Sequence, residues 1–165
     1  MKLLVAGIGN IFFGDDGFGP EVARVLAADR LPGVKIEDYG IRGLHLAYEM
    51  LAGYDRVFLV DAVPRGGLPG TLYVIEPDST ASTAVPDAHR MDLENVFAFL
   101  RVIGGEPPPV TLVGCEPSAI DETLGLSQAV RDAVAPAADL VRRLLNEALA
   151  ARQRGEKESM AWSEA

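Results

Sequence analysis

Short apolar runs alternate with segments whose apolar residues are spaced as on one face of a helix, along most of this 165-residue chain. The apolar runs predict strands at residues 3–8, 34–39, 56–60, 71–75 and 110–113. The helical spacing predicts helices over about residues 20–31, 44–51, 93–103 and 127–149. Strands that alternate with helices predict a single-domain α/β sandwich with a largely parallel sheet. The domain is expected to cover residues 1–150, followed by a polar, flexible tail over 151–165.

The pattern also predicts which side chains are buried. On the second predicted helix, Leu44, Tyr48 and Leu51 form an apolar stripe that is expected to face the core. This leaves His45 on a solvated polar face. Cys115 ends the last predicted strand, and we interpret it as a small buried residue rather than as a nucleophile.

Composition narrows the class of protein. The net charge of −9 disfavours a nucleic-acid binder, and no apolar run reaches the roughly 20 residues of a membrane span. One cysteine excludes an internal disulfide, and one cysteine with two histidines excludes Cys₄, Cys₂His₂ and His₃ zinc sites. The N-terminal apolar stretch breaks at Asn10, so we expect no signal peptide and predict a cytoplasmic protein.

A glycine-rich loop with two adjacent carboxylates follows the first predicted strand. It contains Gly7-Ile8-Gly9-Asn10 and, three residues later, Gly14-Asp15-Asp16-Gly17. Phe12 occupies the third glycine position of a dinucleotide fingerprint and no Gly-Lys-Ser/Thr follows, which excludes both common nucleotide-binding loops. The aspartates either cap the following helix or act at the carboxyl edge of the sheet, where α/β folds bind their ligands.

Asp61 and His89 follow the third and fourth predicted strands and are further candidates. If Asp16, Asp61 and His89 converge at one sheet edge, they form a mixed oxygen and nitrogen set suited to Ni²⁺, Mn²⁺, Fe²⁺ or Zn²⁺. Three ligands would leave coordination positions open for a substrate. The plainer interpretations are a turn residue for Asp61 and a helix-entry surface residue for His89.

These segments resemble the hydrogenase maturation endopeptidases, which process the large subunit of nickel–iron hydrogenases. The matching residues are 7–10, 14–19, 38–43, 61–62, 69–71, 112–114, 125–127, Pro117 and the loop around His89. The resemblance extends over about residues 2–148. The opening glycine and aspartate pattern is its most specific part, because no common nucleotide-binding loop combines these features.

The resemblance implies a three-layer α/β/α sandwich with a twisted, mostly parallel five-stranded sheet. It also implies an endopeptidase that removes a C-terminal extension from the large-subunit precursor after nickel has been inserted. By resemblance, Asp16, Asp61 and His89 contact the nickel. Asp38 is a further functional candidate. The expected catalytic residues are therefore Asp16, Asp38, Asp61 and His89. Ile41 stands where the family often has Thr or Ser, a departure consistent with a different hydrogenase partner.

The resemblance implies no cofactor of the protein's own: the Ni²⁺ belongs to the substrate, and Zn²⁺ or Cd²⁺ could occupy the site in vitro. The expected partner is the large-subunit precursor, with no nucleic acid, no membrane insertion and a monomeric state favoured. For the mechanism, either the metal activates the carbonyl or a water, or Asp38 or Asp16 acts as general base. Two other functions stay open: a non-catalytic metallochaperone or assembly factor, and a metal-dependent hydrolase of small amides or peptides.

Overall fold

The computed structural model describes residues 1–77 and 93–163, with side chains described up to residue 154. Its strands are β1 (Leu3–Ile8), β2 (Val34–Gly40), β3 (Arg56–Ala62), β4 (Leu72–Ile75) and β5 (Val110–Cys115). Its helices are the 3₁₀ helix η1 (Gly14–Gly17) and the α-helices α1 (Phe18–Leu26), α2 (Gly43–Met50), α3 (Leu93–Val102) and α4 (Gln128–Ser163). The five predicted strands are therefore confirmed.

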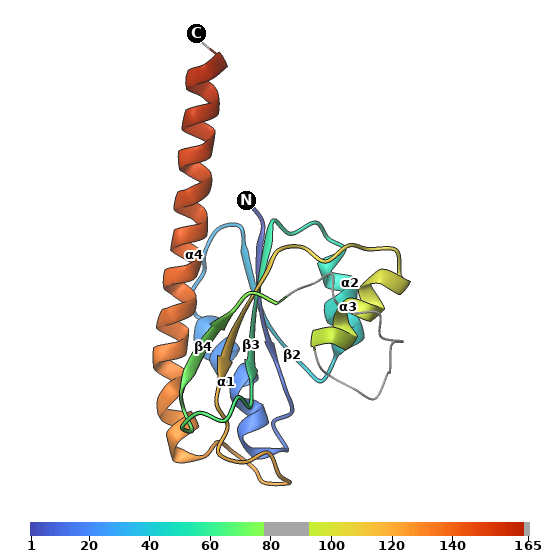
Figure 1. Ribbon diagram of the computed structural model, residues 1–165, viewed down its shortest axis with the longest axis vertical. Helices are drawn as coiled ribbons and strands as arrows, with labels where there is room; N and C mark the ends of the chain where they lie inside the picture. The colour runs from blue at the N-terminus through green and yellow to red at the C-terminus, as the bar shows by residue number, and fades with distance from the viewer. Residues whose placement is uncertain (78–92, 164–165) are drawn as a thin grey trace.

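The strands form one five-stranded sheet in the order β2-β1-β3-β5-β4. All neighbouring pairs are parallel except β4 and β5, which are antiparallel. Helices α1 and α4 pack together on one side of the sheet and α2 and α3 on the other, as Figure 1 shows. The predicted three-layer, mostly parallel architecture is confirmed.

Alternate residues of the central strand β1 supply the two cores of the sandwich. Leu3 and Val5 face α1 and α4, whereas Leu4, Ala6 and Ile8 face α2 and α3. This alternation follows from the two-residue period of a strand. Because β1 is buried on both faces, it consists of an uninterrupted apolar run.

The predictions for two helices need correction. Helix α1 ends at Leu26, so Leu31 does not lie on it. The chain turns after Leu26, where Asp29 forms an ion pair with Arg142 of α4 at 2.6 Å. Helix α4 continues to Ser163, so the boundary predicted at residue 150 falls inside a helix.

The apolar stripe predicted for the core on α2 is wrong. Leu44, Tyr48 and Leu51 are all exposed. The buried side chains are instead those of Leu46, Ala47 and Met50. Both sets have helical spacing, and the spacing does not show which of them meets the sheet.

In the described part of the chain, residues 1–77 and 93–163, no helix combines the length and apolar character needed to cross a bilayer. The cytoplasmic location stays a prediction.

The direction of β4 changes one expectation about the site. Ile75, the last residue of β4, pairs with Leu112 near the start of β5, whereas Leu72 pairs with Cys115 at its end. The segment after β4 therefore leaves the sheet at the amino edge, opposite to the edge reached by β1 and β3. The prediction that the loops after the first, third and fourth strands begin at one edge is wrong for the fourth.

Candidate active site

Asp16 lies at the carboxyl edge of the sheet, in the η1 helix that follows β1. Its Oδ2 accepts a hydrogen bond from the backbone N–H of Asn10 at 2.7 Å. Gly9 has φ +129°, and a Cβ at this position would lie 1.9 Å from the Asp16 carbonyl oxygen. The glycine therefore lets the loop fold back closely enough to hold Asp16 in place.

The Asp16 carboxyl is half-buried, and this burial raises its pKa although the Asn10 hydrogen bond opposes the shift. Its Oδ1 accepts no hydrogen bond from residues 1–77 or 93–154. Asp16 thus combines enhanced basicity with an oxygen that the described residues leave available.

The preceding carboxylate, Asp15, has a different role. It is 1 % exposed and points away from the edge, into the body of the protein. Its oxygens accept hydrogen bonds from the backbone N–H groups of Ser118, Ala119 and Ser127, and from the Ser127 hydroxyl. Neither aspartate caps η1 or α1, so the capping interpretation is wrong. Asp15 instead joins the start of α4 to the loop after β5.

Gly19 brings the start of α1 against the ends of two neighbouring strands. A Cβ on Gly19 would lie 2.2 Å from the carbonyl oxygens of both Ile8 in β1 and Val60 in β3. From β1 the chain continues to β2 on one side, and β3 lies on the other side of β1. The order of strands therefore reverses between β1 and β3, and this position is the topological switch point of the sheet. Ligands of open α/β sheets bind at such points.

Asp61 is the second carboxylate at this switch point. It is the penultimate residue of β3, and its Oδ1 accepts the backbone N–H of Ala62 at 2.8 Å. Strand alternation places Asp61 on the same side as Leu59, which packs with α2 and α3. Asp61 is half-buried near the end of this central strand.

Asp38 lies on the other neighbour of β1. It pairs with Gly7 of β1, which in turn pairs with Val60 of β3. Two strand spacings therefore separate Asp38 from β3, which is about 10 Å. The exposed carboxylate accepts the backbone N–H of Gly40 at 2.8 Å through Oδ1.

Arg42 fixes the turn that carries Asp38. Its Nη2 donates to the Asp38 carbonyl oxygen, and its Nε donates to the Tyr39 carbonyl oxygen at 3.1 Å. The guanidinium also lies 5.8 Å from the centre of the Tyr39 ring. No motif in the sequence marks this role of Arg42, although the preceding residue, Ile41, stands where the family often has Thr or Ser.

Glu116 fixes the loop that follows Asp61. This buried carboxylate accepts hydrogen bonds from the backbone N–H groups of Arg65 and Gly66 and from the Tyr73 hydroxyl. Burial acts to raise the pKa of Glu116, but the hydrogen bonds from Tyr73 and the backbone outweigh it and lower the pKa. No motif in the sequence marks Glu116, because its partners lie 43 to 51 positions away.

The expected metal set is only partly described. Asp16 and Asp61 lie at the two strands of the switch point, whereas His89 lies outside the described residues. Among residues 1–77 and 93–154, no group of three His, Cys, Asp or Glu side chains is placed to hold a metal ion. The proposed set of three ligands stays a prediction.

His45 and Cys115, for which no functional role was expected, lie as the sequence predicts. His45 is exposed on α2, as predicted. Cys115 is fully buried, and this burial, followed by the charges of Asp15 and Glu116, raises its pKa to about 11. A neutral, inaccessible thiol does not act as a nucleophile, which agrees with the interpretation as a small buried residue.

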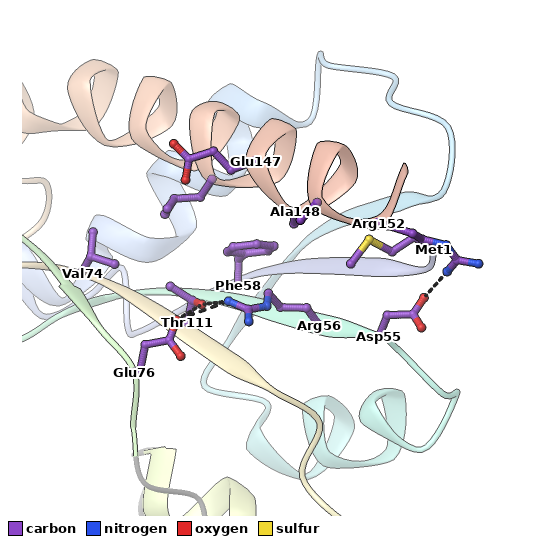
Figure 2. Close-up of a pocket in the computed structure, with 12 residues that line it drawn as sticks. Met1, Asp55, Arg56, Phe58, Val74, Glu76, Thr111, Glu147, Ala148 and Arg152 are labelled. Carbon is purple, nitrogen blue, oxygen red and sulfur yellow. Dashed lines mark hydrogen bonds and ion pairs between the residues drawn. The ribbon is translucent and has the colours of Figure 1, made fainter. Parts of the chain in front are cut away.

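A cavity of about 740 Å³ lies far from these carboxylates, between the amino edge of the sheet and the second half of α4 (Figure 2). Four of the charged side chains that line it form two ion pairs: Arg56 with Glu76 at 3.3 Å, and Arg152 with Asp55 at 3.5 Å. Arg56 also donates to the Thr111 hydroxyl at 3.0 Å. These pairs stabilise the end of the sheet that is opposite to the candidate site.

Known proteins are similar to this chain in both sequence and fold. A profile of the HycI family, described as hydrogenase maturation protease, matches residues 20–144. The hydrogenase 2 maturation protease of Escherichia coli K12 is 32 % identical over 152 residues, which cover 89 % of this chain and 92 % of that protein. The hydrogenase expression/formation protein HoxM of Cupriavidus necator is 31 % identical, covering 86 % of this chain and 74 % of HoxM.

Solved structures agree with this result. The hydrogenase maturating endopeptidase HybD from E. coli superposes with a TM-score of 0.72 at 27 % identity, covering 90 % of this chain and 94 % of HybD. A hydrogenase 2 maturation peptidase from a Thaumarchaeota archaeon has a TM-score of 0.68 at 34 % identity, covering 88 % of this chain and 99 % of that one. The family profile covers Asp38 and Asp61, and the chain belongs to the hydrogenase maturation protease family, whose members are endopeptidases that process hydrogenases.

Proposed function

We propose that this protease removes the C-terminal extension of a nickel–iron hydrogenase large-subunit precursor after nickel insertion. In this proposal Asp16, Asp61 and His89 contact the nickel of the substrate, and Asp38 takes part in catalysis. The observation that carries it is the position of Asp16 and Asp61 on either side of the switch point between β1 and β3.

The course of the chain supports the inclusion of His89. Leu51, just after α2, and Leu100, near the end of α3, both lie against Gly105, so the two helices end at the same side of the domain. Helix α2 begins just after the carboxyl end of β2, and α3 therefore begins toward that same edge. His89 precedes the first residue of α3 by four positions, which is at most about 14 Å of extended chain.

The proposed role of the nickel is recognition. Two carboxylates and an imidazole bind a nickel ion that the precursor presents. A precursor without nickel has no metal ion for these side chains to bind. Contact with the metal places the scissile peptide bond at the carboxyl edge. Bound in this way, the nickel can polarise the carbonyl or a water molecule.

Asp16 and Asp38 are the two carboxylates proposed as general base. Burial raises the pKa of Asp16, which increases its affinity for a proton. Asp38 is exposed at the same edge and is held by the turn that Arg42 fixes. If Asp38 is the base, Asp38→Asn lowers kcat by about 10²-fold or more with little change in KM, whereas loss of a metal contact raises KM first.

The test uses nickel-loaded and nickel-free precursor, with mass spectrometry of the large subunit before and after incubation. We expect the wild type to shorten only the loaded form, and His89→Ala to fail. His45→Ala is the matched control, because His45 is the other histidine of the chain and is exposed on α2. Processing by His89→Ala at the wild-type rate would contradict the recognition role. An unchanged mass with the wild type would instead indicate an assembly factor that does not cleave.

A further inference from the structure

A groove of about 520 Å³ lies beside the candidate site, between the loop after β1 and the first turns of α4. Ile11 and Gly17, which line one side, belong to the same loop as Asp16. Leu126, Val134 and Ala135 line the other side. Its volume lies within the roughly 300–1,000 Å³ typical of ligand pockets, and its walls are mainly apolar.

One guanidinium in this groove has no acidic partner in the described part of the chain. Arg131 donates to the Leu126 carbonyl oxygen at 2.9 Å and forms no ion pair with residues 1–77 or 93–154. Arg24, the other cation that lines the groove, is paired with Glu21 at 2.8 Å. The groove therefore offers one uncompensated positive charge, although the chain as a whole carries a net charge of −9.

Glycines keep the floor of the groove open. Gly14, Gly17 and Gly125 all line it, and a Cβ on Gly125 would meet only Arg131 Nη2, at 3.9 Å. The loop on this side is joined to the segment between β5 and α4, because Gly14 donates its backbone N–H to the Thr123 carbonyl oxygen at 2.7 Å. Apolar walls, an accessible floor and one guanidinium suit a short peptide segment that ends in a carboxylate.

We propose that this groove holds the C-terminal extension of the precursor, with the α-carboxylate of its last residue on Arg131. The inference rests on the proposed function, because that function supplies the extension. In this proposal a chain held at Asp16 enters the groove past Ile11 and Gly17, which line it and belong to the same loop as Asp16, and the segment beyond the scissile bond continues toward Arg131. Because Arg131 is exposed, its contribution to affinity is modest, which suits the release of a product peptide.

The test measures binding of a synthetic peptide with the sequence of the extension, as the free acid and as the C-terminal amide, by isothermal titration calorimetry. The wild type is expected to bind the acid about three- to fivefold more tightly than the amide. Arg131→Gln should remove this preference without changing the affinity for the amide. Arg143→Gln is the matched control, because Arg143 is also exposed on α4 but does not line the groove.

A second variant guards against misfolding of the first. Ala135 is exposed on α4 and lines the groove, and glutamate is a good helix former, so Ala135→Glu should fold normally. Its added negative charge should weaken binding of the acid about threefold or more and leave the amide almost unchanged. Equal affinity of the wild type for acid and amide, or equal effects of Arg131→Gln and Arg143→Gln, would overturn the proposal.

Peptide binding requires no cleavage, so the two proposals fail separately. If the wild type leaves loaded precursor intact but prefers the free-acid peptide through Arg131, the proposed function fails and the groove assignment stands. If the wild type shortens the precursor but binds acid and amide equally, only the groove assignment fails.

Discussion

The Asp15 carboxylate accepts the backbone N–H of Ser127 at 2.6 Å, which joins η1 to the residue before α4 across 112 positions of the chain. Asp16, which the proposed function places in the site, comes directly after Asp15. The hydrogen bonds of Asp15 therefore stabilise the fold, whereas Asp16 lies at the carboxyl edge of the sheet.

We expect Asp15→Asn to lower the free energy of unfolding by about 2–4 kcal/mol, because an amide cannot accept all four hydrogen bonds that the buried carboxylate accepts. Urea unfolding followed by circular dichroism measures this change. Asp16→Asn is the control: it should retain wild-type stability within about 1 kcal/mol and lose processing. Similar stability losses for both variants would contradict the division of roles.

Arg42→Lys tests how firmly the Asp38 turn must be held. Lysine keeps the charge but cannot donate to two carbonyl oxygens from one planar group. We expect processing to slow about three- to tenfold, with less than about 1 kcal/mol lost in stability. Arg30→Lys, at an exposed position between α1 and β2, should change neither quantity.

Glu116 should contribute stability that depends on pH. Its pKa is lowered below the ordinary value of 4.5 in the folded state, so the folded protein binds this proton less tightly than the unfolded chain does. The stabilisation is present above that ordinary value and is lost as the pH falls through the folded-state pKa. Glu116→Gln should therefore cost most at neutral pH, and the gap to the wild type should narrow below about pH 4. Urea midpoints at both pH values give the comparison, and a gap of constant size would refute the linkage.

Gly19→Ala tests the contact at the switch point. The added methyl group would overlap two backbone carbonyl oxygens that cannot move independently of β1 and β3, and we expect a loss of about 3 kcal/mol or more. Gly53→Ala is the comparison, because its Cβ meets no atom within 4 Å and only its positive φ is unfavourable. That variant should lose about 1 kcal/mol in the same thermal or urea unfolding measurement.

Local pattern was sufficient to predict the strands and most of the site edge. Buried parallel strands are continuous apolar runs, so β1 and β3 were recognised directly, and Asp61 was assigned to the end of β3. The loop with Asp16 was found because its glycines and carboxylates follow such a strand. These features depend on residues that are close together in the chain.

Features that depend on distant partners were not predicted. The acceptor role of Asp15 and the anchoring role of Glu116 each require loops that only the finished sheet brings together. The direction of β4 is of the same kind, because the sequence of a four-residue strand does not show in which direction the strand pairs with its neighbour. The exposed face of α2 was missed since Leu44 and Leu46 belong to two faces of similar apolar character.

The different directions of Asp15 and Asp16 follow from the geometry of η1, in which three residues make one turn and neighbouring side chains point about 120° apart. Removing one residue before Gly14 would therefore rotate the wrong carboxylate toward the substrate. The exposed side chain of Phe12 faces no such demand. In related sequences the amino acid at position 12 should vary freely while the length of the loop stays constant, so that a gap in an alignment here would be stronger evidence of lost activity than a substitution at Phe12.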